Sequence, residues 1–147
     1  MTFELGTDGP KVIVAGVDGS DTSMRACAYA WGLARRNDSL LILVHVSPLT
    51  SLTTLAPGGA TAMLEASDRL AGEIRKELDR AIARGPAVRH RLVHERGDAA
   101  AVLARIADEN RADLVVVGAS TQAGHRLVGS VAVRLVRAGR WPVTVVP

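Results

Sequence analysis

Short apolar runs alternate with longer amphipathic stretches along this chain. The most apolar runs cover residues 11–17, 40–46, 114–118 and 143–146, and runs this short are typical of strands buried on both faces of a parallel sheet. Between them, apolar residues recur at helical spacing. Strands that alternate with helices pair in parallel through right-handed crossovers. The sequence therefore predicts an α/β fold, an open doubly wound parallel sheet with helices on both faces.

A further strand is predicted over 88–94, where His90 and Leu92 alternate with Arg89 and Arg91. An alternating strand that carries charge suits a sheet edge, because one side meets water and the charge discourages pairing with another chain. The expected order is β-α-β-α-β-α-β-α-β, with five strands.

The first helix is expected to begin after Ser20, which is a suitable N-cap, and to end near 37–39. Its buried stripe is predicted from the spacing i, i+3, i+4, i+7. That stripe consists of Met24, Cys27, Ala28 and Trp31.

The other helices are predicted from Leu64 to the stop at Gly85-Pro86, from Gly97-Asp98 onward, and over 130–138. The stretch from Leu49 to Thr61 contains Thr, Ser, Pro and Gly but no charge and no clear period. We expect a loop there, and loops of that length are commonly functional.

The length of 147 residues and the 48% share of apolar residues fit one domain. We expect residues 1–147 to form it, with 1–10 as a flexible segment. The single cysteine, Cys27, excludes an intrachain disulfide framework and favours a reducing compartment. No run approaches the roughly 18 apolar residues of a membrane helix, and the acidic start does not resemble a secretory signal. A cytoplasmic protein is expected.

Charge is distributed unevenly along the sequence. Residues 1–73 carry a net charge of −3 and residues 74–147 a net charge of +6, with no carboxylate side chain after Asp113. Arg126, Arg134, Arg137 and Arg140 follow that aspartate. They form either a solvated helix face or a place for an anionic ligand. Without interleaved aromatic residues or a reading-helix motif, no specific nucleic-acid binding is expected.

Candidate ligand-binding residues follow the predicted strands. In doubly wound sheets, ligands bind beyond the carboxyl ends of the strands. Asp18 follows the first strand; it either contacts a ligand or orders the turn while Ser20 caps the helix. The segment from Gly118 to Ser130 follows the fourth strand, and Gly129-Ser130 at a helix start would present free N–H groups to a phosphate. The spacing Gly124-x4-Gly129 matches a P-loop, but Ser130 stands where the lysine should be.

Four segments occur in order along the chain: Asp18-Gly19-Ser20, Arg96-Gly97-Asp98-Ala99, the Gly118 to Ser130 loop and Trp141-Pro142-Val143-Thr144-Val145-Val146. Together they resemble the universal stress protein family, and the resemblance extends from Lys11 onward. The resemblance implies strand order 3-2-1-4-5, a homodimer formed through the last strand, Val143 to Val146, and a role in stress survival.

Nucleotide binding divides that family, and the glycine loop carries the distinction. ATP-binding members have the pattern Gly-x2-Gly-x9-Gly-Ser/Thr. This chain matches at Gly118 and at Gly129-Ser130, but Thr121 replaces the second glycine and only seven residues precede Gly129. Its loop length resembles that of members that do not bind ATP.

Three functions therefore stay open at this point. The chain is a stress-response module that binds ATP, with Mg²⁺, in the Gly118–Ser130 loop; or it is a nucleotide-independent stress protein that acts through protein partners; or it is a weak ATP-hydrolysing enzyme. If a nucleotide binds, the resemblance implies that Asp18 and the Val46 backbone contact the adenosine. It implies that Gly118, Gly129, Ser130 and Val131 contact the phosphates and the ribose.

No catalytic residue and no metal site are predicted. His90 and His94 share one strand face but lie about 13 Å apart at roughly 3.3 Å per residue, too far for one ion. His45 lies inside an apolar run rather than at a strand end, which argues against a triad with Asp18 and Ser20. Cys27 lies on the predicted buried stripe, where thiolate formation is disfavoured. We expect binding and signalling rather than turnover.

Overall fold

A computed structural model describes residues 9–48, 57–120 and 128–147. The described strands form one five-stranded sheet in the order β3-β2-β1-β4-β5, and every pairing is parallel. The strands are β1 (Val12–Val17), β2 (Leu40–Ser47), β3 (His90–Arg96), β4 (Leu114–Gly118) and β5 (Val143–Val146). The helices are α1 (Asp21–Asn37), α2 (Gly59–Arg84), α3 (Ala99–Glu109) and α4 (Ser130–Ala138). The predicted fold class and strand order are confirmed.

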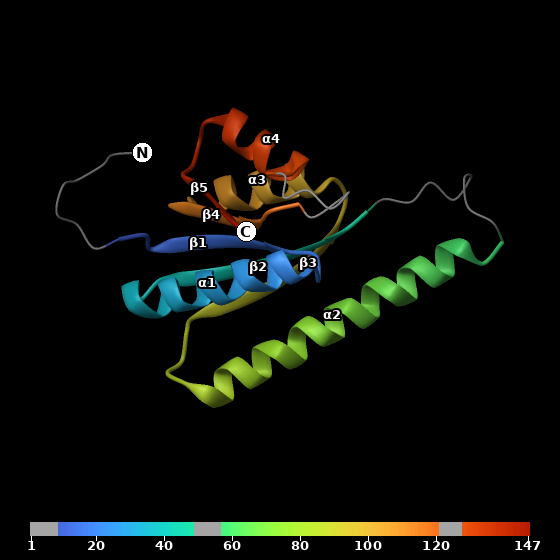
Figure 1. Ribbon diagram of the computed structural model, residues 1–147, viewed down its shortest axis with the longest axis horizontal. Coiled ribbons are helices and arrows are strands. Elements are labelled where there is room, and N and C mark those ends of the chain that lie inside the picture. Colours follow the sequence, from blue (N-terminus) through green and yellow to red (C-terminus); the bar gives the residue numbers. More distant parts are fainter. Residues whose placement is uncertain (1–8, 49–56, 121–127) are drawn as a thin grey trace.

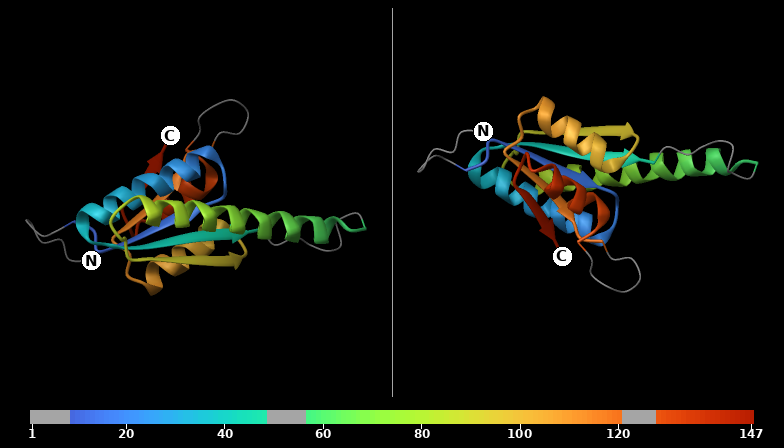
Figure 2. Two further views of the ribbon diagram at one scale, coloured as in Figure 1. Left: turned by 90° about the horizontal axis from the view of Figure 1, so that it is seen from below. Right: turned by 90° about the horizontal axis from the view of Figure 1, so that it is seen from above.

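Helices cover both faces of the sheet (Figure 1). α1 and α2 lie on one face, and α3 and α4 lie on the other, which the two further views also show (Figure 2). Because side chains alternate along a strand, Leu41 and Leu43 of β2 join the core under α1 and α2. Ile42 and Val44 join the second core, under α3 and α4.

β3 occupies an edge of the sheet, as its alternating pattern predicts. Its residues alternate between half-buried and exposed over most of its length. The strand begins and ends two residues later than expected, at His90 and Arg96, because the last residue of β2, Ser47, pairs in register with Arg96. Arg89 precedes the strand, and its carbonyl accepts a hydrogen bond from the Leu41 amide at 2.9 Å.

The predicted stripe of α1 is wrong in its orientation. Met24, Cys27 and Trp31 are only partly buried, and Ala28 is exposed. Instead, the helix buries small residues: Thr22, Ser23, Ala26, Ala30 and Ala34. Small side chains let the helix axis lie close to the sheet, which moves the larger residues to the flank of the helix.

The predicted Leu49–Thr61 loop is also too long. Residues 49–56 lie outside the described part of the chain, but α2 already begins at Gly59 and includes Thr61. The expected flexible segment 1–10 lies mostly outside the described residues as well. Pro10, however, is tied to the fold, because its carbonyl accepts a hydrogen bond from the buried Ser39 hydroxyl at 2.5 Å.

Gly118, the last residue of β4, makes close contact between α1 and the sheet possible. A Cβ atom at this position would lie 2.5 Å from the carbonyl carbon of Thr22 and 2.6 Å from the amide nitrogen of Ser23. The Thr22 hydroxyl donates a hydrogen bond to the Ala119 carbonyl at 2.7 Å. The first turn of α1 is therefore packed directly on the end of β4. None of the described helices is long and apolar enough to cross a membrane.

This contact predicts that Gly118→Ala lowers the free energy of unfolding by about 1–3 kcal/mol, the usual cost of overpacking. Gly32→Ala in the interior of α1 is the matched control, since nothing lies within 4 Å of the added Cβ there. It should raise stability by up to about 1 kcal/mol through helix propensity. Urea denaturation of the three proteins measures both values, and equal effects of the two substitutions would contradict the packing argument.

Candidate functional site

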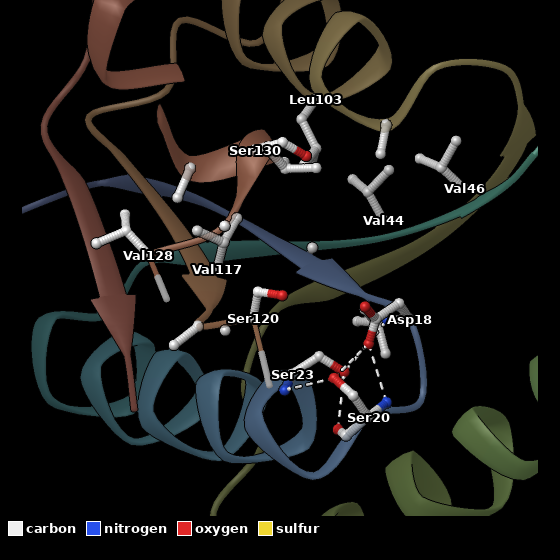
Figure 3. A pocket seen from close by; sticks show the side chains of 18 residues that line it. Asp18, Ser20, Ser23, Val44, Val46, Leu103, Val117, Ser120, Val128 and Ser130 are labelled. Carbon is white, nitrogen blue, oxygen red and sulfur yellow. Dashed lines mark hydrogen bonds between the residues drawn. The ribbon is translucent and has the colours of Figure 1, made fainter. Parts of the chain in front are cut away.

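A cavity of about 560 Å³ opens at the carboxyl ends of β1, β2 and β4, on the face covered by α3 and α4. Figure 3 shows the side chains that line it. Strand ends contribute Gly16, Val17, Asp18, Val44, Val46, Val117, Gly118, Ala119 and Ser120. Helices and their preceding turns contribute Ser20, Ser23, Ala99, Leu103, Val128, Gly129, Ser130, Val131 and Ala132. This is the place that the fold class predicts for a ligand.

The turn after β1 is fixed by hydrogen bonds between Asp18 and Ser20 (Figure 3). Asp18 Oδ1 accepts from the Ser20 amide at 2.9 Å and from the Ser20 hydroxyl at 2.5 Å. The same hydroxyl oxygen accepts from the Ser23 amide and so caps α1. Asp18 therefore does order the turn and Ser20 does cap the helix, as one of the two interpretations expects. The second carboxylate oxygen of Asp18 points away from these bonds.

These hydrogen bonds also determine the charge state of Asp18. Partial burial by itself raises the pKa of this carboxyl, but the bonds from the Ser20 hydroxyl and amide outweigh it and lower the pKa below its ordinary value of 3.8. Asp18 is ionised at neutral pH. The site thus presents a fixed negative charge that accepts hydrogen bonds.

The start of α4 lies across the cavity and offers donors. The first intrahelical bond joins the Val133 amide to the Gly129 carbonyl, and no side chain caps the helix. The amides of Ser130, Val131 and Ala132 therefore have no carbonyl within the helix to bond. Gly129 adopts φ 89°, which favours glycine, and a Cβ there would lie 3.1 Å from Ser120 Cβ.

The remaining wall of the cavity is apolar. Val44 and Val46 point into it from β2, and Leu103 faces them from α3 (Figure 3). Alternation along β2 brings both valines to this face. The cavity thus joins three surfaces: an acceptor carboxylate, a set of backbone donors and an aliphatic wall.

All six site residues expected from the sequence line this one cavity. They are Asp18, Val46, Gly118, Gly129, Ser130 and Val131. Gly118 has a second role in the structure, since its missing Cβ allows α1 to approach. Thr121, Gly124, His125 and Arg126 of the expected loop lie outside the described residues.

Ser120 also lines the cavity and lies within the expected Gly118–Ser130 segment, although the sequence did not single it out. Leu103 and Val44 were not expected to line it, because no sequence signal distinguishes a core side chain from one that lines a cavity. Ser23 lies within α1, and only the tight turn at Asp18 brings it to the rim.

Two of the four arginines that the sequence offered for an anionic ligand have other partners. Arg134 forms an ion pair with Asp98 at 2.7 Å, and Arg140 forms one with Asp108. The hydrogen bond from Arg134 lowers the pKa of Asp98. Among the described residues, Asp18 is the one charged side chain that lines the cavity. For Arg134 and Arg140, the structure therefore favours the interpretation as solvated surface residues over that as a place for an anionic ligand.

Comparison with known proteins identifies relatives over nearly the whole chain. The profile of the universal stress protein family matches residues 10–147. A universal stress protein from Methanocaldococcus jannaschii is 27% identical over 138 residues, which cover 92% of this chain and 81% of the relative.

Solved structures give the same result. Universal stress protein UspA from Lactobacillus plantarum matches with a TM-score of 0.75 and 22% identity, over 93% of this chain and 97% of that one. A universal stress protein solved in complex with cAMP is 32% identical over 94% of this chain and 97% of its own, with a TM-score of 0.61.

The turn predicts that Ser20→Ala lowers the free energy of unfolding by about 0.5–2 kcal/mol, since the substitution removes the N-cap of α1. Denaturation at pH 7 measures this value. Thr61→Ala, an exposed hydroxyl on α2, is the control and should change stability little. If Ser20→Ala lowers the free energy of unfolding no more than the control does, the cap does not contribute to stability.

The charge of Asp18 predicts a pH dependence. Because folding lowers the pKa of Asp18, the ionised carboxylate stabilises the fold above its ordinary pKa of 3.8, and this stability is lost as the pH falls through the folded-state pKa. The stability difference between the wild type and Asp18→Asn should therefore shrink between pH 6 and about pH 3. A difference that stays constant with pH would rule out the ionised carboxylate as its source.

Proposed function

This chain belongs to the universal stress protein family, and we propose that it acts in the cytoplasm as a homodimeric, single-domain stress-response protein that binds an adenine nucleotide in the cavity of Figure 3. One observation carries the proposal. The cavity combines an ionised carboxylate on one side with unbonded helix amides on the other, separated by an aliphatic wall. These are the three surfaces that a phosphorylated nucleoside needs.

The phosphate would bind at the start of α4. Backbone N–H groups at a helix N-terminus attract anions, because their hydrogens point outward and the helix dipole favours negative charge there. Gly129 lets the backbone approach an oxygen closely, and the hydroxyls of Ser120 and Ser130 add two more donors at the rim. This arrangement binds a phosphate without requiring a lysine or arginine from the described lining.

The nucleoside would lie toward β1 and β2. The open oxygen of Asp18 accepts hydrogen bonds from ribose hydroxyls or from an exocyclic amine, and Asp18 rejects a phosphate by charge repulsion. The side chains of Val44, Val46 and Leu103 provide an apolar surface for the base. The polarity of the cavity therefore sets the direction of the ligand, with its phosphate toward α4.

The relative solved with cAMP supports an adenine nucleotide as the ligand, because it is 32% identical and matches almost all of this chain. If the nucleotide is ATP, Mg²⁺ would enter with its phosphates, as this ion commonly does. The hard oxygens of the Ser120 and Ser130 hydroxyls suit such an ion. Bound Mg²⁺ would neutralise phosphate charge.

The dimer would form at β5, the edge strand next to β4. All four of its residues are half-buried, and three of them are valines. Val133 and Val136 of the neighbouring α4 are exposed, Val136 to 57%. An edge strand leaves N–H and C=O groups unpaired, and a second copy would cover both these groups and the apolar side chains.

The nucleotide proposal predicts measurable binding of cAMP, AMP or Mg-ATP by calorimetry and by an increase in melting temperature. Ser130→Ala should weaken the affinity about five- to tenfold through the loss of one hydrogen bond to an anion. Thr61→Ala on α2 is the matched hydroxyl control and should bind as the wild type does.

Two outcomes separate the alternatives. Purified protein that contains no adenine after denaturation, and whose melting temperature does not change with millimolar nucleotide, would favour action through protein partners alone. ATP turnover that Ser130→Ala abolishes while the fold is retained would favour an enzyme.

The dimer proposal predicts a mass of twice 15.5 kDa by light scattering at micromolar concentration. Thr144→Lys should yield monomers, since a lysine on an edge strand opposes pairing with a second strand. Circular dichroism checks that the variant folds. A wild-type mass of 15.5 kDa would contradict the proposal.

A further inference from the structure

The sheet opens between β1 and β4 at the point where the cavity begins. Residues 13–15 of β1 pair in register with residues 114–116 of β4. The next residues of both strands line the cavity. The strand order reverses here, and this is where a ligand has room between strand ends. Within the described residues, no register pair joins β1 to β4 beyond this point, so strand pairing does not hold the two sides of the cavity together.

One side chain spans this opening. Thr22, the second residue of α1, donates a hydrogen bond from its hydroxyl to the Ala119 carbonyl at 2.7 Å. The bond is buried, and Thr22 is only 2% exposed. In the part of the chain that the structure describes, it is the one side-chain hydrogen bond between residues 18–23 and residues 117–120. Because it is shielded from water, it is stronger than an exposed bond of the same kind.

The α1 side of this bond belongs to the nucleoside end of the proposed site, the turn from Asp18 to Ser20. Thr22 Oγ1 lies 3.3 Å from the Ser20 hydroxyl oxygen, and Ser20 donates to Asp18 through its hydroxyl and its amide. The turn is also held from the opposite face of the sheet, where the His45 ring donates from Nδ1 to the Val17 carbonyl at 3.0 Å. That bond joins β2 to β1, so it supports the turn without reaching β4.

The β4 side of the bond belongs to the phosphate end, which consists of Ser120 and the start of α4. The Ala119 amide donates to the Val146 carbonyl at 2.8 Å, so both backbone polar groups of Ala119 are bonded. Ser120 follows directly and packs against Gly129, where an added Cβ would lie 3.1 Å from Ser120 Cβ. Gly129 precedes the free amides of α4. A continuous path of bonds and contacts therefore leads from the turn through Thr22 to the phosphate donors.

A ligand that contacts both ends depends on the separation between them. If the two ends move independently, the ligand must fix their separation when it binds, and the lost conformational entropy lowers its affinity. A ligand that occupies one end only does not meet this cost, because it gains nothing from the other end. A link between the ends therefore affects a phosphorylated nucleoside more than the nucleoside alone.

We propose that Thr22 is a positioning residue of the nucleotide site. Its hydroxyl holds the nucleoside end and the phosphate end at the separation at which a phosphorylated nucleoside contacts both. Thr22 is not among the described residues that line the cavity, so it acts on the ligand through Ala119. The inference rests on the proposed function for its ligand, but its structural part is measurable in the free protein.

The test compares adenosine, which has no phosphate, with cAMP or AMP, whichever the wild type binds more tightly. Thr22→Val replaces the hydroxyl with a methyl group of similar size and leaves the Ala119 carbonyl without its donor. The variant should bind the nucleotide about five- to tenfold more weakly than the wild type does, the equivalent of one hydrogen bond. It should bind adenosine within about twofold of the wild type, since adenosine does not reach the phosphate end. Calorimetry measures both affinities.

Three further variants separate positioning from general stability. Thr22→Ser keeps the hydroxyl and should restore nucleotide affinity to within about twofold of the wild type. Ser39→Ala is the matched control, because Ser39 is 1% exposed and donates to the Pro10 carbonyl at 2.5 Å, at the opposite end of the sheet. It should lower stability and leave nucleotide affinity unchanged. If Thr22→Val does not fold, Thr22→Ala leaves room for water at the Ala119 carbonyl and should show the same loss of affinity.

Hydrogen exchange in the free protein provides a readout without a ligand. The Ser20 and Ala119 amides report on the two ends, and their protection factors should fall further in Thr22→Val than in Ser39→Ala. If the wild type binds no adenine nucleotide, the proposed function fails, and these protection factors alone decide whether Thr22 holds the two ends together. Protection that falls no further than in Ser39→Ala would overturn the proposal. So would a Thr22→Val protein that binds the nucleotide as tightly as the wild type does, or that loses affinity for adenosine and nucleotide equally.

Discussion

The contact between the first turn of α1 and the end of β4 determines the geometry of the whole site. Gly118 has no Cβ, so the backbone at Thr22 lies directly on it, and the Thr22 hydroxyl bonds the Ala119 carbonyl. The chain must therefore turn sharply between β1 and α1, and the Asp18–Ser20 bonds provide that turn. The ends of β1 and β4 consequently meet at one rim.

The alternation of side chains along a strand gives the sheet two chemically different faces near this rim. On β2, Val44 and Val46 form the aliphatic wall of the cavity, while His45 between them lies in a layer of imidazoles and hydroxyls. Nothing but backbone separates the two environments. A peptide carbonyl such as that of Val17 is then a physical connection between them, because it is bonded from one face and its neighbouring residue acts on the other.

The sequence predicts the fold well because each strand and helix has its own period, and parallel pairing follows from their alternation. The six site residues expected from the sequence all line one cavity, because the carboxyl ends of parallel strands converge at one edge of the sheet. The prediction of the buried stripe of α1 was wrong because the hydrophobic period favours large residues such as Trp31, whereas the helix lies close to the sheet and buries small residues such as Thr22 and Ser23, which adjoin Gly118. The partners of Arg134 and Arg140 are the N-cap of α3, Asp98, and Asp108 within that helix, and no local pattern in the sequence reveals such pairing.

The start of α2 has little support from the rest of the fold. Its N-terminal part projects beyond the sheet (Figures 1 and 2), residues 61–66 are all exposed, and Gly58 offers no side-chain cap. Only from Ser67 and Leu70 onward does the helix reach the core. The first turns are therefore held by intrinsic helix propensity alone. They melt as a helix–coil equilibrium of their own, so warming shortens α2 from its start while the cooperative core stays folded.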